Sequence, residues 1–546
     1  MADLELIFLL LAAAAALQVL AQRFSIPQPA LLVLGGAALA LVPGLPRPAL
    51  DPNVIFLIFV PPLLYFASTR APLRELSQQF WPIFHLSVPL VLITMVAVAV
   101  TAHLLTPELT WPAAFVLGAI VAPPDPIAAV AVMRPLRTPA ALTAVLEGEG
   151  MFNDATALVA YRIAVGAAIT GVFSWGHAAV EFAWSGALGV VVGLLVARGV
   201  VTVRRQVQDL PLVDNSISLL TPFAAYVPAD ALGGSGVLAV VAAGLYVGQH
   251  LATMLSPAAR VQAAMTWGMV AYILENLVFI LIGLELPYLI HETQPHSLSQ
   301  WLGFGAAVSL VVILVRLVLV VPSPFLWRAL TRSRASERGL GDIALVGWMG
   351  VRGADSVVIA LALPQLTAAG APFPGRGLIV FITFAVVFTT LVLQGLTIGP
   401  FTRRLGLQGD TQAEQEEAHA RHVVASAGLK RLGELAGSGG GSTEIVDELR
   451  LRHQRRARRW ETREHRLGGE PIGRHEVISG DDGKSEAHAS SYRRLRAGMI
   501  DAERRAVVEL RDRGVIGADV LRRLERDLDL ETLLLGDPPA DSSIRA

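Results

Sequence analysis

Long apolar runs fill most of the chain between residues 4 and 402, and they constrain its fold more than any other feature. A helix needs about 20 mostly apolar residues to cross the hydrocarbon core of a bilayer. The chain is therefore predicted to be an all-α polytopic membrane protein. By this rule the sequence holds about thirteen transmembrane helices, at residues 4–22, 28–45, 53–69, 82–105, 110–133, 139–170, 177–201, 211–231, 233–250, 262–287, 299–323, 341–366 and 376–402.

The composition excludes several other classes of protein. Of the 546 residues, 53% are hydrophobic and 16% are charged, whereas soluble domains average about 25% charged residues. The net charge of −1 gives no basic field for binding nucleic acid. The absence of cysteine removes disulfides, thiol catalysis and cysteine-bound metals. No nucleotide or metal motif stands out, so we expect no cofactor.

The basic residues indicate how the predicted helices are oriented, because cytoplasmic loops of membrane proteins are enriched in Arg and Lys. With a cytoplasmic C-terminus, thirteen spans place the N-terminus outside, and only Arg47 and Arg376 then fall in outside loops. The inside loops hold Arg23, Arg70, Arg74, Arg134, Arg137, Arg198, Arg204, Arg205, Arg260, Arg328, Arg332, Arg334 and Arg338. We therefore predict a multi-pass protein of the cell membrane with its C-terminal tail in the cytoplasm.

Two of the predicted helices are interrupted near their middle. Residues 122–126 read Ala-Pro-Pro-Asp-Pro, and residues 350–355 read Gly-Val-Arg-Gly-Ala-Asp. Proline removes backbone donors and clashes with the preceding turn, so the first helix should break at mid-depth. The two segments are seven spans apart and run in opposite directions, as in the inverted repeats that form a transporter's binding site. The free helix ends carry partial charges, which Asp125 and Arg352 have the signs to complement.

Several ionisable side chains fall within the predicted membrane interior. Each costs on the order of 3 kcal/mol there and therefore needs a structural or functional reason. They are Glu147, Glu149, Asp154 and Arg162 in the sixth segment, Glu275 beside Asn276 in the tenth, and Arg316 in the eleventh. Most of them are expected to pair across helices, either Glu149 with Arg316 or Glu275 with Arg162.

Asp154 is the exception, because its neighbour Asn153 is neutral and it has no obvious dedicated partner. Glu147 lies seven residues earlier and so on the same face of the helix. A carboxylate in a partly wet cavity can hold either a proton or a metal cation near neutral pH. That competition at one side chain is the minimum machinery of a cation/proton exchanger.

Several short stretches, in order along residues 1–405, carry a family resemblance. They are 59–65 (FVPPLLY), 125–129 (DPIAA), 146–149 (LEGE), 152–158 (FNDATAL), 218–222 (SLLTP), 235–239 (SGVLA), 275–277 (ENL), 348–353 (WMGVRG) and 393–397 (LQGLT). Together they resemble the monovalent cation:proton antiporters of the NhaP and eukaryotic sodium/proton exchanger type. The resemblance implies a secondary antiporter and not an enzyme, with inverted repeats, two crossed interrupted helices and commonly a homodimeric assembly.

By this resemblance, Asp154 binds the transported monovalent cation and the proton, Asn153 is its neutral neighbour, and Asp125 sits at the crossed helices. An Asn-Asp pair is associated in the family with electroneutral exchange. The expected function is exchange of Na+ or Li+ for H+ by alternating access in pH homeostasis, with K+/H+ exchange as the alternative. The structural or gating charges would be Glu149, Arg316, Arg352, Glu147, Glu275 and Asp355.

Some positions depart from the family pattern. Phe66 stands where many relatives carry an acidic residue after the Pro-Pro motif, and Pro124 and Gly150 replace a threonine and a serine often seen around the cation. These changes leave the choice among Na+, Li+ and K+ open. Asp355 is unusual so close to Arg352. We expect it to neutralise the arginine; the alternative is a compensating carboxylate for the cation.

Residues 406–546 are predicted to form a separate, cytoplasmic helical tail with a regulatory role. Residues 437–442 are Gly and Ser only and read as a flexible linker, and Thr443 is a suitable cap for a helix running to about Arg466. The arginines of that helix are expected to form a solvated face in preference to a lipid-binding one. Further apolar stripes at helical spacing run through Leu495, Met499, Ala502, Ala506 and Leu510, and through Val520, Leu521, Leu524 and Leu528.

Two other classes of protein are remote alternatives. A cation channel would pass current without coupled proton movement and would not need Asp154 to titrate. An intramembrane aspartyl protease would use the Gly-x-Gly-Asp string at residues 339–342, but Asp342 is an ordinary candidate for a helix N-cap. The exchanger therefore remains the leading hypothesis.

Overall fold

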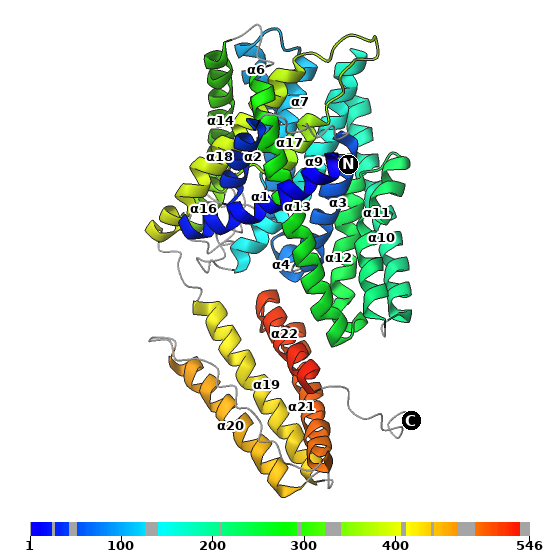
Figure 1. Cartoon of the computed structure of the whole chain (residues 1–546), viewed down its shortest axis with the longest axis vertical. Coiled ribbons are helices and arrows are strands. Elements are labelled where there is room, and N and C mark those ends of the chain that lie inside the picture. Colours follow the sequence, from blue (N-terminus) through cyan, green and yellow to red (C-terminus); the bar gives the residue numbers. More distant parts are fainter. Residues whose placement is uncertain are drawn as a thin grey trace, which may run out of the picture. The chain divides into compact units, whose positions relative to one another are not determined.

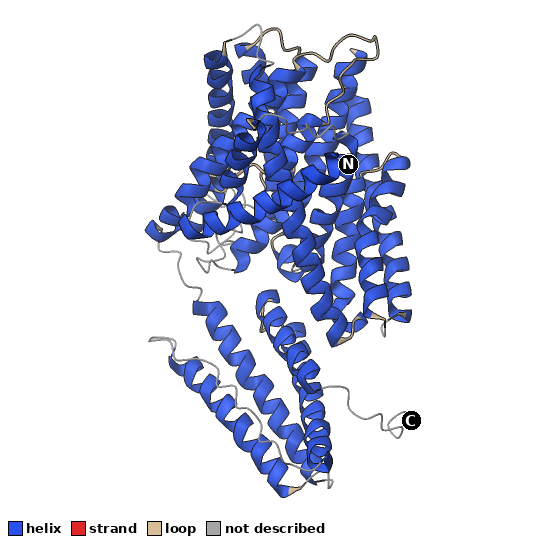
Figure 2. Cartoon of the chain, in the orientation of Figure 1, coloured by secondary structure: helices blue, strands red, loops and turns tan. Residues whose placement is uncertain are grey.

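Helices account for nearly all of the regular structure in the described part of the chain (Figure 2). The computed structural model describes residues 2–535 except 25–27, 43–51, 72, 126–139, 208–209, 292–296, 323–339, 406–410, 438–441 and 467–485. Within these residues no strand is present, and the β-type pairing is an isolated bridge between Leu366 and Pro372. The prediction of an all-α protein is confirmed.

The chain divides into two compact units, of which the first comprises residues 1–254 and 265–409. Its helices are α1 (Ala2–Phe24), α2 (Gln28–Ala40), α3 (Pro52–Arg70), α4 (Leu73–Gln78), α5 (Phe80–Ser87), α6 (Pro89–Leu105), α7 (Trp111–Val121), α9 (Ala140–Thr170), α10 (Trp175–Gln206), α11 (Pro211–Ala231), α12 (Gly236–Met254), α13 (Pro257–His291) from residue 265 on, α14 (Leu298–Val320), α16 (Leu340–Trp348), α17 (Ala354–Leu361) and α18 (Arg376–Arg404). α10, α11 and α12 lie side by side (Figure 1).

Every predicted transmembrane segment overlaps one of these helices or a consecutive pair of them. Within the described ranges, five helical stretches are long and apolar enough to cross a membrane: Phe80–Leu105, Ala178–Gln206, Pro257–Glu285, Leu298–Val320 and Arg376–Arg404. Several shorter apolar helices accompany them, including α2 and α7. The number of spans and their orientation remain predictions.

The helix interruptions follow from proline and glycine. α7 ends at Val121, and the next residues include Pro123 and Pro124, which have no backbone N–H to continue the ladder. The predicted segment 341–366 is two helices, α16 and α17, separated by residues 349–353. Both interruptions were predicted. The rest of the segment 110–133, with its Pro126, and the inside-loop Arg134 and Arg137 lie outside the described residues.

The first interruption is held inside the protein and away from lipid. All of α7 from Val116 to Val121 is buried, and the helix packs against α6 and α9 (Figure 1). Non-helical backbone at membrane depth is tolerated only where it is surrounded by protein or lines a wet cavity. The burial of α7 therefore explains how an interrupted helix is stable at this depth.

The second unit contains residues 255–264 and the tail from residue 410. The tail helices are α19 (Thr411–Gly437), α20 (Thr443–Arg466), α21 (Glu486–Asp512) and α22 (Ala518–Leu535), and α19 lies alongside α20 and α21 (Figure 1). α20 ends at Arg466 as predicted, and Thr443, which was predicted to cap it, is its first helical residue. The predicted apolar stripes supply much of the core of this unit, with Leu495, Met499, Leu510, Val520, Leu524 and Leu528 buried.

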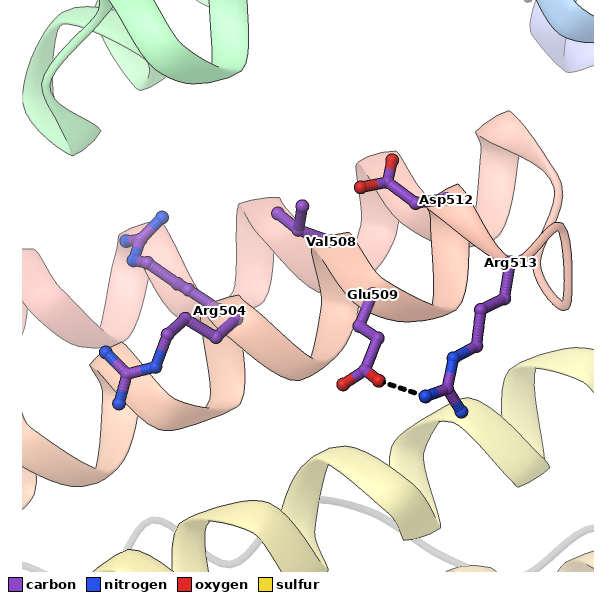
Figure 3. A pocket seen from close by; sticks show the side chains of 6 residues that line it. Arg504, Val508, Glu509, Asp512 and Arg513 are labelled. Atoms are coloured by element: carbon purple, nitrogen blue, oxygen red, sulfur yellow. Dashed lines mark ion pairs between the residues drawn. The ribbon is translucent and has the colours of Figure 1, made fainter.

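The surface of the tail is rich in charged pairs along single helices. On α20 the half-exposed Arg450 and Arg452 pair with Asp447 and Glu448, as expected of a solvated face. A shallow hollow on α21 is lined by Arg504, Arg505, Val508, Glu509, Asp512 and Arg513 (Figure 3). Its Glu509–Arg513 ion pair spans one helical turn at the surface, where such pairs contribute about 0.3–0.5 kcal/mol. These six side chains do not form an arrangement suited to catalysis or ion binding.

Candidate functional site

The two helix interruptions meet each other in the first unit. The backbone N–H of Asp125, just after α7, donates to the carbonyl of Val351 at 2.7 Å. The side chain of Asp125 packs directly on Gly353, where an added Cβ would overlap its carboxylate. Glycine at position 353 is therefore what allows the Asp125 carboxylate to reach the start of α17. Sequence reasoning placed both residues at interruptions, and the structure brings the interruptions together.

Arg352 closes the open end of α7. Its buried guanidinium donates from Nε to the carbonyl of Val121 and from Nη2 to that of Ala122, both at 2.9 Å, and also to the carbonyl of Gly350. These include carbonyls that a helix C-terminus leaves without partners. The structure thus places Arg352 at the negative end of a half-helix, where its charge is favourable.

Glu149 and Arg316 form an ion pair whose side chains are both only 2% exposed. Arg316 donates through Nη1 and Nη2 to the two carboxylate oxygens, the second at 2.8 Å, and through Nε to the carbonyl of Val346 at 3.2 Å. This is the pairing that the sequence suggested. It joins α9 to α14 and α16, and it commits both charges to structure.

The other suggested pair is wrong. Arg162 pairs with Asp230 of α11, and these two side chains are about 40% exposed (41% and 42%). The sequence placed Arg162 in the same predicted helix as Asp154 but could not identify its partner on another helix. Glu275 instead lies within electrostatic reach of Asp355, and the adjoining Asn276 accepts a hydrogen bond from Gln28 at 2.5 Å.

Asn153 has a definite structural partner that sequence reasoning did not find. Its side chain is fully buried and donates from Nδ2 to the carbonyl of Pro124 at 2.8 Å. Pro124 immediately precedes Asp125, so this bond ties α9 to the end of the interrupted helix. The residue type could have suggested this bond. An Asn side chain has N–H donors that can satisfy a free carbonyl at a helix break, whereas an ionised Asp can only accept.

Asp154, the next residue, has no such partner. Its partly exposed carboxylate makes no hydrogen bond or ion pair with any residue that the structure describes. The charges that act on it most are those of Asp355 and Asp125. Glu147 is also partly exposed, two turns earlier on α9. The site therefore combines one unpaired carboxylate with two acidic neighbours, and the nearby guanidinium groups are engaged elsewhere.

The expectation that Asp355 neutralises Arg352 is wrong. The hydrogen bonds of the guanidinium go to backbone carbonyls, and Asp355 forms no ion pair with a described residue. Two residues so close in sequence suggested a pair. The α17 helix begins between them, at Ala354, and Arg352 is drawn away toward the end of α7.

Phe66, which follows the Pro-Pro motif in α3, belongs to an aromatic stack. Phe66 lies against Trp267 with ring centroids 6.1 Å apart and an interplanar angle of 13°, and the guanidinium of Arg70 lies 4.5 Å from the Phe66 centroid. No oxygen ligand is available from this side chain. Among the described residues no cluster of three or more His, Cys, Asp or Glu is close enough to hold a resident metal.

The fold and this site define a membrane transporter of the cation/proton antiporter class. Residues 7–404 match the transmembrane sodium/hydrogen exchanger family, and the chain belongs to that family. It is a sodium/proton antiporter and not an enzyme.

Individual relatives agree with this assignment. The chain is 32% identical to an uncharacterized Na+/H+ exchanger of Mycobacterium tuberculosis over 98% of its own length and 96% of the relative's. It is 29% identical to the Na+/H+ antiporter ApNhaP of Aphanothece halophytica over 74% of each chain. Its fold is similar to that of the sodium proton antiporter MjNhaP1 of Methanocaldococcus jannaschii, with a TM-score of 0.57 at 18% identity, covering 74% of this chain and 98% of the other.

Proposed function

We propose that Asp154 is the side chain at which Na+ and H+ compete during exchange. The observation that carries this is the contrast between carboxylates: Glu149 is fully paired with Arg316, whereas Asp154 is partly exposed and unpaired within the described structure. The preceding residue, Asn153, binds the carbonyl of Pro124, and the charge of Asp125 acts on Asp154. Structural roles remain for Glu147 and Glu275.

The proposed mechanism is alternating access. A carboxylate without a cationic partner is costly in a low-dielectric interior, and binding of a proton or a monovalent cation neutralises its charge. Asp154 loaded with either one can therefore pass through the occluded state, while the bare carboxylate resists it. One cation then exchanges for one proton, which is the electroneutral stoichiometry implied by the Asn-Asp pair.

The finer properties of the transporter belong to the same proposal. We place it in the cell membrane with its N-terminus outside and its tail in the cytoplasm, as a homodimer in the lipid bilayer. Li+ and K+ are further candidate substrates. A Bacillus pumilus relative, 30% identical over 75% of this chain, is named a sodium, potassium, lithium and rubidium/H+ antiporter. The aromatic side chain at Phe66 also removes one oxygen ligand that would help to select a small cation.

The test is proton flux in proteoliposomes loaded with a pH-sensitive dye. Na+, Li+ and K+ are added in turn to vesicles holding the full chain or its Asp154→Asn variant. We expect a cation-driven pH change that the variant reduces by at least about 100-fold, because the amide can neither lose a proton nor neutralise a cation.

The matched control is Asp342→Asn, which removes an acidic side chain from the first turn of α16 and should retain wild-type flux. Normal exchange by Asp154→Asn would overturn the single-carboxylate mechanism. Cation current without any pH change would favour a channel, and a response to K+ in preference to Na+ would establish the alternative substrate.

A further inference from the structure

Asp355 is a second carboxylate with no cationic partner among the described residues. It lies in the first turn of α17 and is partly exposed. The charges that act on it most, after the effect of burial itself, are those of Asp125 and Glu275. A carboxylate that faces other carboxylates is unfavourable unless a proton or cation lies among them.

Contacts between three helical segments bring this carboxylate to the site of Asp154. Asn153 of α9 binds the carbonyl of Pro124 at 2.8 Å. Asp125 binds the carbonyl of Val351 at 2.7 Å and packs on Gly353. Each of the aspartates at positions 125, 154 and 355 lies within two residues of one of these contacts. The two helix interruptions and α9 therefore meet at the chain segments that carry the three aspartates.

The three aspartates are more exposed to solvent than the described side chains next to them in the sequence. Asp125, Asp154 and Asp355 are all partly exposed, whereas the flanking Arg352 and Ser356 are 1% and 3% exposed. Of the charges acting on Asp154, that of Asp355 has the largest effect, ahead of Asp125. Asp355 is thus the acidic side chain whose charge acts most strongly on Asp154.

Two simpler explanations for Asp355 do not account for this arrangement. Neutralisation of Arg352 is contradicted by the hydrogen bonds of that guanidinium to backbone carbonyls. An acidic residue in the first turn stabilises a helix by about 0.3–1 kcal/mol, but that effect does not require other carboxylates beside it.

We propose that Asp355 is a second carboxylate ligand of the transported cation, which it holds together with Asp154. Hard cations prefer oxygen ligands, and carboxylates supply both the oxygen and the charge. This inference rests on the proposed function and adds the residue that sets cation affinity.

The experiment measures the rate of exchange against Na+ concentration for the full chain in proteoliposomes. Asp355→Asn should raise the half-maximal Na+ concentration by about tenfold or more, while exchange at saturating Na+ persists. Asp355→Glu, which keeps the carboxylate, should restore most of the affinity. Asp342→Asn, the matched change in the first turn of α16, should leave the half-maximal concentration unchanged.

A second measurement covers a variant that no longer transports. Na+ that binds only the folded protein raises its thermal midpoint in detergent, and Asp355→Asn should lose this shift at concentrations that stabilise the wild type. An unchanged half-maximal concentration, or an unchanged thermal shift, would overturn the role of Asp355. So would recovery of Na+ affinity on adding Arg352→Gln to Asp355→Asn, because that result would mark a charge-balancing pair.

The two proposals fail in different ways in the same vesicles. If the wild type shows no cation-driven pH change, or Asp154→Asn exchanges normally, the proposed function is wrong. If those two arms behave as expected and Asp355→Asn binds Na+ normally, only the ligand role of Asp355 is wrong.

Discussion

At the scale of single residues, the buried Glu149–Arg316 pair should contribute to the stability of the folded protein and not directly to transport. Arg316→Met would leave the Glu149 carboxylate buried, at 2% exposure, without its partner. Breaking a buried pair on one side costs about 3–5 kcal/mol, so we expect a large fall in the thermal midpoint of the purified protein. The thermal midpoint is measured in detergent, with loss of monodispersity as the signal of unfolding.

The matched control for this prediction is Arg162→Met. Its partner Asp230 is 42% exposed and stays hydrated when the pair is lost, so the change in midpoint should be small. The double variant Glu149→Gln with Arg316→Met should recover part of the lost stability because no charge is then stranded. Equal effects of the two single variants would contradict the structural assignment of the buried pair.

Residue types along the sequence predicted part of this site, but they could not predict contacts between different helices. The isolation of Asp154 and the Glu149–Arg316 pair followed from residue type and span position. The bond from Asn153 to Pro124 and the partner of Arg162 depend on which helices touch, and spacing along one helix carries no such information. The same limit applies to Asp355, whose nearest arginine in sequence is turned toward the end of α7.

At the scale of helices, proline, glycine and apolar length were enough to predict most elements, including the two interruptions. The division of the predicted segment 82–105 at Val88 was missed. There α5 ends at Ser87 and α6 begins with Pro89 at its first position. Proline is well tolerated at the start of a helix, so a single proline in an apolar run is compatible with either a kink or a new helix.

The packing of α20 and α21 in the tail yields a prediction about pH. Glu503 of α21 is buried, and burial raises its pKa. His453 of α20, whose Nε2 lies 3.5 Å from Glu503 Oε1, and the charges of Arg496 and Arg456 outweigh this and hold the pKa below its ordinary value of 4.5. The fit is close, since a Cβ added to Gly428 of α19 would lie 2.6 Å from Glu503 Oε1.

A carboxylate whose pKa is lowered by folding stabilises the folded state above its unfolded pKa, and this contribution is lost as the pH falls through the folded pKa. The tail should therefore lose hydrogen-exchange protection in α20 and α21 on acidification below about pH 4.5. Hydrogen exchange is measured on the full chain and corrected for the intrinsic exchange rate. Glu503→Gln should lower the protection of α20 and α21 at neutral pH and weaken its dependence on pH in the acid range. Glu509→Gln, in a pair that is 59% exposed on the carboxylate side, is the control and should change neither.

At the scale of the whole molecule, all proposed ion-binding side chains belong to the first unit, and the tail has its own apolar core. The sequence indicated this division through the change from apolar segments to charged ones near residue 405. We therefore expect a chain ending at Gly409 to retain cation-driven proton flux in proteoliposomes, within about an order of magnitude of the full chain. The same truncation carrying Asp154→Asn should be inactive, which shows that the residual flux passes through the site. Loss of flux in a truncated chain that remains monodisperse would mean that the tail is part of the transport machinery, and the assignment of exchange to residues 1–405 alone would be wrong.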